Sequence, residues 1–589
     1  MPSREKFFLR LLLYQVPGPT SFEDLKSVFI DGQRVVCATY QEACIKRGLT
    51  EDDSAAETAF NEAFLTIKND FLLRSFFVNL IIHQLASDPW GLFQKFKKEL
   101  CAPEMHKANI DEPNDHMIND ILKELKTLFE SQDKDMADFI GEKNMPKDIP
   151  KEKVEAREIL DEINFDVDVQ AKMAENHYAL LNKDQKHFVD TILHAIKFQK
   201  PGIFAVEANG GCGKTFCINT ILATLRAQGH IALATATTGQ AATLFDRGRT
   251  IHSKTKAPIK LDAASLCNFK PNSPTAKLIK RAVLMVMDEY TIGHKHLYET
   301  ISRSFQNLLE NDLPYGGKIM LHSGDWKQIL PVVQGGSRAD IVEATLKCSK
   351  LWDHMQVFQL TENVRIKNAK SDDAAQYDQY LISVGTGKIQ THSEVGEFMI
   401  KIPDEMKSDT NDLKSFVHEI FPNLQIKIKS GLENRDVLGP NWNQFIHERA
   451  IICARNQDVE EINNICLDLM EGDVMEYLSA DRCIHKKDEI NFPIEFLNSL
   501  TPPSCPSHKL VLKVGAPLIL MRNIDAVNGH VNGAQYNIIG LGKGFIHARL
   551  AVGPYINGPK PEILIPRIKF HPEDRKLPFE FQRIQFPVR

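Results

Sequence analysis

Apolar residues follow a helical spacing through much of the first hundred positions. Phe60, Phe64, Ile67 and Phe71 recur every three or four residues, and the pattern continues to about Gln84. This spacing predicts amphipathic helices that bury one face. Residues 1–105 are therefore expected to form a helical N-terminal region.

A different pattern runs from residue 176 to residue 365. Here short apolar runs alternate with longer amphipathic stretches; the runs are Gly202–Val206, Ile231–Ala236, Val283–Met287 and Ile319–Leu321. Runs of this length between helical patterns predict buried parallel strands with helices on both faces of the sheet. The fold class expected for this region is a doubly wound α/β domain.

The last third of the chain changes pattern twice. Residues 366–507 are mixed and charged, with an α/β pattern resuming at Ala450–Ala454. From residue 508 the segments Leu510–Val514, Pro517–Met521 and Ile563–Ile565 are strand-like, and Gly- and Asn-containing turns separate them. Residues 508–589 are therefore expected to contain a small β-barrel-like module.

The net charge conceals an uneven distribution. The chain has 589 residues and a formal charge of −6, from 71 Lys and Arg against 77 Asp and Glu. Its length suggests about four domains. Between Cys101 and Leu180 there are 20 acidic and 10 basic residues, so the rest of the chain carries +4. Residues 106–175 are expected to be a solvated, helical acidic linker, and the mildly basic remainder leaves a nucleic-acid partner open.

Cysteine usage and hydropathy favour a protein inside the cell. The 11 cysteines are odd in number and lack a Cys-x-x-Cys pair, which is typical of reduced thiols rather than a disulfide framework. Arg10 interrupts the apolar run Phe7–Leu13, and the uncharged run Ser75–Ala86 is too short to span a membrane. We expect an amphipathic helix at the first run and a buried helix at the second.

The segment Ala208–Thr215 reads Ala-Asn-Gly-Gly-Cys-Gly-Lys-Thr and lies between a strand-like run and the amphipathic stretch Phe216–Gln228. This context is typical of a phosphate-binding loop, whose backbone N–H groups surround phosphate oxygens at a helix N-terminus. The residues expected to hold nucleotide are Gly210, Gly211, Cys212, Gly213, Lys214 and Thr215. Lys214 should reach the β- and γ-phosphates, and the Thr215 hydroxyl should bind Mg²⁺. Ala208 stands where the motif usually has its first glycine, and a negative φ at this position would accommodate alanine. The alternative interpretation of the whole segment is a glycine-rich turn that arose by chance.

An acidic pair follows the apolar run at Val283–Met287. Asp288 and Glu289 would lie at the carboxyl end of a strand, beside the phosphate-binding loop. Asp288 is a candidate Mg²⁺ ligand, and Glu289 a candidate general base for the attacking water. An Asp-Glu pair that caps a helix is the alternative, and the preceding loop favours the first interpretation.

A third polar segment, His322–Val332, follows the strand-like residues near Ile319. Gln328 could sense the γ-phosphate from the end of this strand, or the segment could be an ordinary strand-to-turn junction. The residue pattern alone leaves both interpretations open.

Several longer segments resemble one family of DNA motors. Gly324–Val332, which reads GDWKQILPV, closely resembles motif III of the Pif-one family of superfamily-one DNA helicases. Other segments that resemble this family are Leu181–Gln185, Thr235–Leu244, Thr250–Ser253 and Leu360–Arg365. Segments similar to its Helitron-transposon branch are Phe8–Leu13, Ser21–Leu25, Asn456–Asn463, Tyr477–Asp481 and Phe496–Leu500.

The resemblance implies a fold, cofactors and residue roles. It implies a P-loop NTPase with two RecA-like motor domains, at 176–365 and from 366 onward, that uses ATP and Mg²⁺. Gln185 would read the adenine and Gln328 would couple the γ-phosphate to DNA. Arg365 would act as an arginine finger that reaches across from the second motor domain. A surface arginine at a helix start is the alternative for that residue.

The resemblance also implies single-stranded DNA and duplex junctions as partners. The candidate DNA-contacting residues are Thr237, Thr238, Thr250, His252 and Ser253. Residues 501–589 carry 12 Lys and Arg against 5 Asp and Glu, which could add electrostatic affinity or form a solvated face.

Two functions remain open at this stage. The first is an ATP-dependent helicase that moves from the five-prime to the three-prime end, with family roles in DNA repair, recombination and telomere maintenance in the nucleus. The second is a C-terminally truncated, transposon-derived relic that binds ATP and DNA without unwinding. It is considered because the family's motifs V and VI are expected beyond Phe586–Arg589. A P-loop kinase is disfavoured by the GDWKQILPV segment.

Overall fold

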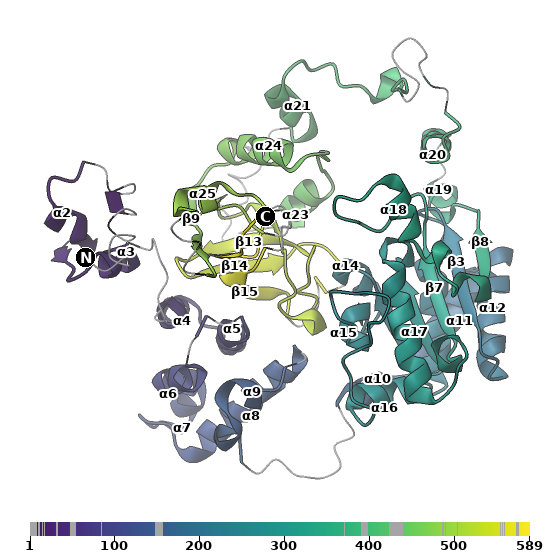
Figure 1. Ribbon diagram of the computed structural model, residues 1–589, viewed down its shortest axis with the longest axis horizontal. Coiled ribbons are helices and arrows are strands. Elements are labelled where there is room, and N and C mark those ends of the chain that lie inside the picture. Colours follow the sequence, from purple (N-terminus) through teal and green to yellow (C-terminus); the bar gives the residue numbers. More distant parts are fainter. Residues whose placement is uncertain are drawn as a thin grey trace. The chain divides into compact units, whose positions relative to one another are not determined.

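The computed structural model divides the chain into two compact units (Figure 1). Unit 1 comprises Met1–Ile149 and Asp409–Arg589, and unit 2 comprises Pro150–Ser408. The structure describes residues 16–589 apart from short gaps, the longest being 48–54, 148–156, 392–398 and 425–439, and before residue 16 it describes 9, 12 and 13. The expected helix at Phe7–Leu13 therefore lies mostly outside the described residues. Among the described helices, none has the length and apolar character needed to cross a membrane.

Unit 2 is built on a six-stranded parallel sheet with the strand order β5-β4-β6-β7-β3-β8. Its strands are β3 (Ile203–Ala208), β4 (Ala232–Ala236), β5 (Arg249–Thr250), β6 (Leu284–Asp288), β7 (Met320–Gly324) and β8 (Met355–Leu360). The four predicted strands are confirmed as β3, β4, β6 and β7. All neighbouring strands pair in parallel, so their carboxyl ends share one edge.

Alternating side chains of this sheet enter two separate cores. Phe204, Val206, Leu284 and Val286 pack with residues of α12 (Lys183–Lys197) and α13 (Lys214–Ala227). The intervening residues Ile203, Met285, Met287 and Met320 pack with α16 (Pro274–Arg281) and α17 (Lys295–Leu309) on the opposite face. A strand buried on both faces has no polar side to alternate with, which is why the sequence shows continuous apolar runs.

The remaining helices of unit 2 surround this sheet. They are α10 (Arg157–Ile163), α11 (Val167–Leu180), α14 (Gly239–Ala242), α15 (Ile251–Thr255), α18 (Arg338–Glu343), α19 (Val364–Ala369) and α20 (Asp372–Gly385). Short 3-10 turns join several of them, including Tyr290–Ile292 after β6 and Trp352–His354 before β8.

The acidic stretch is more ordered than its composition suggests. Helix α8 (Asp115–Ser131) buries Ile121, Leu125 and Phe129 in the core of unit 1. Helix α10 places Ile159 in a core of unit 2. These apolar residues recur at helical spacing among the charges, so each helix has one buried face and one acidic face. The expected solvated linker is therefore packed at these two helices.

The N-terminal part of unit 1 is mainly helical, as predicted. Its helices are α2 (Phe22–Lys26), α3 (Tyr40–Lys46), α4 (Ala55–Thr66), α5 (Asp70–Ile82), α6 (Pro89–Leu100), α7 (Ala102–Ala108), α8 and α9 (Ala137–Ile140). The pattern from Phe60 to Gln84 forms two helices, because Asn69 accepts a hydrogen bond from the Leu72 N–H and caps the start of α5. A two-stranded hairpin of β1 (Ser27–Ile30) and β2 (Gln33–Val36) was not predicted.

The C-terminal part of unit 1 contains antiparallel sheets. They comprise β9 (Met475–Leu478), β10 (Ala480–Cys483), β11 (Lys509–Leu512), β12 (Pro517–Ile519), β13 (Gln535–Leu541), β14 (Phe545–Leu550), β15 (Glu562–Pro566), β16 (Ile568–Phe570) and β17 (Phe581–Gln585). The predicted strands near 510, 517 and 563 are confirmed. Helices of this part are α21 (Leu413–Ile420), α23 (Pro440–His447), α24 (Asn456–Leu469) and α25 (Ile494–Ser499).

The strand expected at Ala450–Ala454 is absent, and these residues have no regular secondary structure. The short apolar run precedes α24 without a partner strand, so its local pattern does not suffice to form a ladder. The strands described within 409–589 pair antiparallel, and the assignment of 366–507 to the start of a second motor domain stays a prediction.

Helices α4 and α5 pack against the sheet of β12 to β15, and Figure 1 shows them beside β14 and β15. The Glu62 carboxylate on α4 accepts hydrogen bonds from the backbone N–H groups of Lys543 and Gly544, both at 2.8 Å. Phe76 on α5 contacts Phe545 edge to face, with ring centroids 6.1 Å apart. The N-terminal helices and the β module therefore share one core.

Candidate nucleotide-binding site

The phosphate-binding loop joins β3 to α13 at the carboxyl edge of the parallel sheet. Gly211 and Gly213 have φ values of 87° and 84°, in the left-handed region that favours glycine. A Cβ on Gly213 would lie 2.6 Å from the Gln185 side chain, so this turn also needs glycine for space. Ala208 ends β3 in an extended conformation, which accommodates its Cβ. The Lys214 ammonium donates to the Ala208 carbonyl at 2.5 Å and so lies over the loop.

Gln185 lies beneath this loop and is 3% exposed. Its Oε1 accepts from the Asn182 N–H at 3.0 Å, in a capping box that starts α12. Its Nε2 donates to the Cys212 carbonyl at 3.0 Å. Both polar atoms thus support the phosphate-binding loop in this structure, and the adenine contact stays a prediction.

Asp288 and Glu289 follow β6 at the same edge. Asp288 is 4% exposed, and burial raises its pKa above the ordinary value. Burial and the neighbouring Asp288 charge also raise the pKa of Glu289. Glu289 has a φ of 55°, a strained conformation for a non-glycine residue, and its Oε2 is buried without a hydrogen-bond partner among the described residues. An unpartnered carboxylate oxygen at this edge fits the role of a base for water.

The loop after β7 carries Gln328. Its Nε2 donates to Asp325 Oδ2 at 3.2 Å, and Asp325 is 7% exposed. The neighbouring Lys327 donates from Nζ to Asn209 Oδ1 at 2.6 Å, which ties this loop to the phosphate-binding loop. Asn209 and Lys327 were not among the predicted site residues, because their contact joins positions far apart in the chain.

Arg365 is the second residue of α19, which follows β8 after a short connection, and its backbone N–H donates to the Gly211 carbonyl at 3.3 Å. The residue therefore belongs to unit 2, together with the phosphate-binding loop. The expectation that Arg365 reaches across from the second motor domain is therefore wrong. Strand β8 is the edge strand beside β3, and it ends next to the phosphate-binding loop. The arginine-finger role itself stays a prediction.

Asn363 is a further residue at the loop that was not predicted. Its Nδ2 donates to the Gly210 carbonyl at 3.2 Å and to Asp378 Oδ1 at 3.1 Å. A Cβ on Gly211 would lie 2.4 Å from Asn363 Oδ1. The segment that follows β8 thus lies directly against the loop.

The five candidate DNA contacts lie after β4 and β5 and have local structural roles. The Thr237 hydroxyl donates to the Glu289 carbonyl at 2.9 Å, while Thr238 and Thr250 cap α14 and α15. His252 Nδ1 lies 3.2 Å from the Ala257 carbonyl oxygen, and the Ser253 N–H donates to the Thr250 hydroxyl. DNA contact by these residues stays a prediction.

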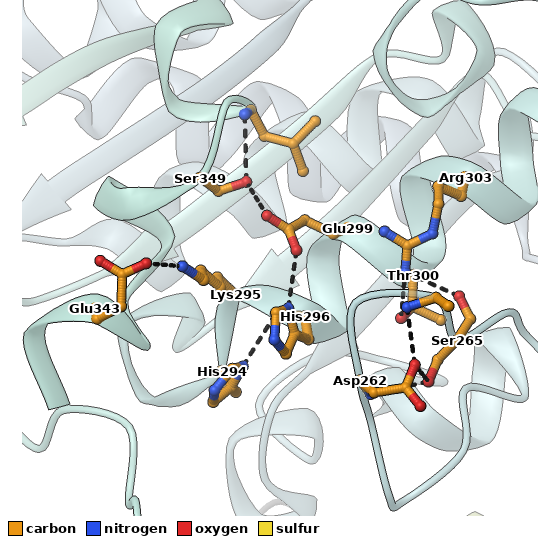
Figure 2. Close-up of polar contacts among 12 residues, drawn as sticks. Asp262, Ser265, His294, Lys295, His296, Glu299, Thr300, Arg303, Glu343 and Ser349 are labelled. Atoms are coloured by element: carbon orange, nitrogen blue, oxygen red, sulfur yellow. Dashed lines mark hydrogen bonds and ion pairs between the residues drawn. The ribbon is translucent and has the colours of Figure 1, made fainter. Parts of the chain in front are cut away.

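A separate polar cluster fixes the start of α17, the helix that follows the acidic pair (Figure 2). Glu299 accepts from the Ser349 hydroxyl at 2.7 Å and lies 2.9 Å from His296 Nδ1. Burial acts to raise the pKa of Glu299, but these contacts outweigh it and lower the pKa overall. Lys295 pairs with Glu343 beside them. These contacts join α17 to the segment before β8.

The residues at the sheet edge fit a bound magnesium nucleotide. Thr215 is the second residue of α13, and the buried Asp288 ends β6 at the same edge of the sheet. In the described part of the chain no three His, Cys, Asp or Glu side chains form a metal-binding group. Mg²⁺ at nucleotide sites takes one or two protein oxygens and completes its shell with phosphates and water.

The parallel sheet, its loop and its acidic strand end define a RecA-like P-loop NTPase domain. Residues 180–395 match the model of the PIF1-like helicase family, and residues 495–541 match the 2B domain of DNA helicase Pif1. In these two regions the chain is therefore similar to the PIF1-like helicases.

Several named proteins are similar to this chain. The chain is 27% identical over 338 residues to the ATP-dependent DNA helicase Pif1 of Psychrobacter, covering 57% of this chain and 44% of that protein. It is 23% identical to the Candida albicans helicase PIF1, covering 59% and 34% of the two chains. A crystal structure of the Candida albicans Pif1 helicase shares 21% identity with a TM-score of 0.43, over 69% of this chain and 84% of that one. The chain spans about half the length of the curated relatives it matches.

Proposed function

We propose that this chain is an ATP-dependent DNA helicase motor of the PIF1-like family. The observation that supports this most is the meeting of the loop of Lys214, the pair Asp288–Glu289, Gln328 and Arg365 at one edge of the parallel sheet. These residues come from the ends of β3, β6, β7 and β8. Such an edge is where open α/β sheets bind ligands.

In this proposal each residue acts on a different part of the nucleotide. The loop N–H groups and Lys214 bind the phosphates, while Thr215 and Asp288 hold Mg²⁺, which neutralises charge on the β- and γ-phosphates. Glu289 accepts a proton from the attacking water, a role suited to a carboxylate with a raised pKa. Gln328 orients the γ-phosphate, and the Arg365 guanidinium stabilises charge that develops on it.

The proposed substrate of the motor is single-stranded DNA, with translocation from the five-prime to the three-prime end and unwinding of duplex at junctions. Thr237, Thr238, Thr250, His252 and Ser253 are its proposed contacts, since they lie at the ends of β4 and β5, along the same edge. Roles in repair, recombination and telomere maintenance, and a nuclear location, stay predictions from the family resemblance.

The test is ATP hydrolysis by the purified 589-residue chain with and without single-stranded DNA. We expect hydrolysis that DNA stimulates, and a loss of at least about a hundredfold in Lys214→Ala, because the ammonium contacts the transferred phosphoryl group. Strand separation is measured on a forked duplex in the same preparation.

The exposed Lys200 provides a matched control, and Lys200→Ala should hydrolyse ATP at the rate of the unchanged chain. Hydrolysis that persists in Lys214→Ala would refute the site assignment. A chain that binds nucleotide but responds to no DNA would contradict the motor function.

A further inference from the structure

One carboxylate connects three segments of the nucleotide site. Oε1 of Glu207, on β3, accepts a hydrogen bond from the Tyr290 hydroxyl at 3.0 Å and from the Trp326 indole N–H at 2.6 Å. Glu207 lies just before the phosphate-binding loop, Tyr290 directly after the acidic pair, and Trp326 in the loop of Gln328. The carboxyl ends of β3, β6 and β7 are therefore joined by side-chain hydrogen bonds as well as by the backbone hydrogen bonds of the sheet.

The Tyr290 ring has a fixed place in this arrangement. It is fully buried, and its ring meets the Trp326 ring at 88° with centroids 5.4 Å apart. A Cβ on Gly324, at the end of β7, would lie 2.9 Å from the Tyr290 ring and 2.8 Å from Thr291. The glycine of the GDW segment thus leaves the space that this ring occupies.

Trp326 is held from its other side as well. Its ring lies 6.1 Å from the Trp352 ring, and the Lys347 ammonium lies 4.5 Å from its centroid. The residue before it is the buried Asp325, which accepts the hydrogen bond from Gln328 Nε2. A fixed Trp326 therefore fixes the backbone from which Gln328 extends.

Glu207 is partly buried, and an apolar side chain at this position would fill the same space. The carboxylate adds two directional hydrogen bonds that an apolar group cannot make, and each one joins β3 to a different segment. A shift of the phosphate-binding loop on nucleotide binding would move Glu207 and, through these bonds, Trp326.

We propose that Glu207 is a positioning residue that couples the phosphate-binding loop to the Asp325–Gln328 loop through Tyr290 and Trp326. The inference rests on the proposed ATP-dependent function and deepens it. Glu207 touches neither the nucleotide nor the DNA in this role. It makes the orientation of Gln328 follow the state of the nucleotide site, and so links hydrolysis to DNA.

The experiment measures kcat and KM for ATP with and without single-stranded DNA in Trp326→Phe and Glu207→Leu. Trp326→Phe removes the indole N–H but keeps an aromatic ring. We expect the stimulation by DNA to fall about tenfold in both variants, because each loses a hydrogen bond to a charged group. KM for ATP should stay within about twofold, since Lys214 and Thr215 are unchanged. Glu207→Gln keeps an acceptor oxygen and should recover most of the stimulation.

Two controls separate coupling from general damage. Lys200→Ala changes an exposed side chain away from the Glu207 bonds, and Tyr178→Phe removes an exposed hydroxyl bonded to Asp190 at 2.9 Å. Both should keep the full stimulation by DNA. If Glu207→Leu fails to fold, Tyr290→Phe takes the place of that variant in the comparison, because it removes one of the two hydrogen bonds to Glu207.

The outcomes distinguish this inference from the proposed function. Equal stimulation by DNA in the unchanged chain and Trp326→Phe overturns the coupling role and leaves the motor function intact. A proportional fall of basal and stimulated rates together with a lower melting temperature also overturns it, since that is structural loss. Absence of Lys214-dependent hydrolysis in the unchanged chain refutes the proposed function instead.

Discussion

At the scale of single residues, the nucleotide site concentrates groups that are unfavourable for folding. Glu289 combines a left-handed φ of 55° with a partly buried carboxylate beside the charge of Asp288. Strain and like charge of this kind persist where the surrounding structure holds them in place, and they are frequent at active sites. The sheet edge supplies that support here, since the Thr237 hydroxyl bonds the Glu289 carbonyl.

This arrangement predicts that Glu289→Gln stabilises the protein while it stops hydrolysis. A carboxyl group whose pKa is raised on folding binds more protons in the folded than in the unfolded state, so stability falls as pH rises through that window. Above the folded-state pKa of Glu289 the full destabilisation is present, and the amide removes it. We expect a gain of about 1 kcal/mol, or about 2–4 °C in melting temperature.

The measurement is thermal unfolding at neutral pH and again toward the ordinary Glu pKa of about 4.3, where the gain should disappear. ATP binding should remain and hydrolysis should fall by at least about a hundredfold, because the proposed base is lost. An unchanged hydrolysis rate would show that Glu289 is not the base.

At the scale of elements, a close contact joins the N-terminal helices to the β module. Gly544 lies in the turn between β13 and β14, and a Cβ there would lie 2.6 Å from Ala59 Cβ on α4. Gly540, in the same hairpin, has room for a Cβ at 3.6 Å from His547 Cβ. The backbone of this hairpin therefore lies close against α4 at Gly544, whereas Gly540 has room for a side chain.

We predict that Gly544→Ala destabilises unit 1 by about 1–3 kcal/mol, because overpacking pushes the turn from α4 and from the Glu62 carboxylate. Gly540→Ala is the matched control and should change stability by less than about 1 kcal/mol. Denaturant unfolding of the full chain measures both. Equal stability of the two variants would mean that the hairpin moves freely against the helix.

At the scale of the whole molecule, unit 2 is continuous in sequence and unit 1 is not. Unit 1 needs Met1–Ile149 and Asp409–Arg589 together, while both cores around the parallel sheet lie within Pro150–Ser408. A continuous segment with complete cores has what a domain needs to fold alone.

We therefore predict that a protein of residues 150–408 folds cooperatively and binds ATP. The counterpart, residues 409–589 without the N-terminal segment, should be poorly folded, because helices α4 and α5 supply part of its core. Circular dichroism melting and nucleotide titration of both segments test this. A well-folded 409–589 segment would contradict the shared core.

The sequence by itself determined the local features: the strands β3, β4, β6 and β7, the phosphate-binding loop, the acidic pair and the helical N-terminal region. These features depend on apolar runs, glycines and charges at short fixed spacings, so residues close together in the sequence are enough to specify them. The tertiary structure decided which strand lies beside which, and this placed Arg365 in unit 2 and brought Glu207 to Tyr290 and Trp326. It also buried one face of α8. Contacts of this kind join residues far apart in the chain, so no local pattern records them, and only the packed cores fix them.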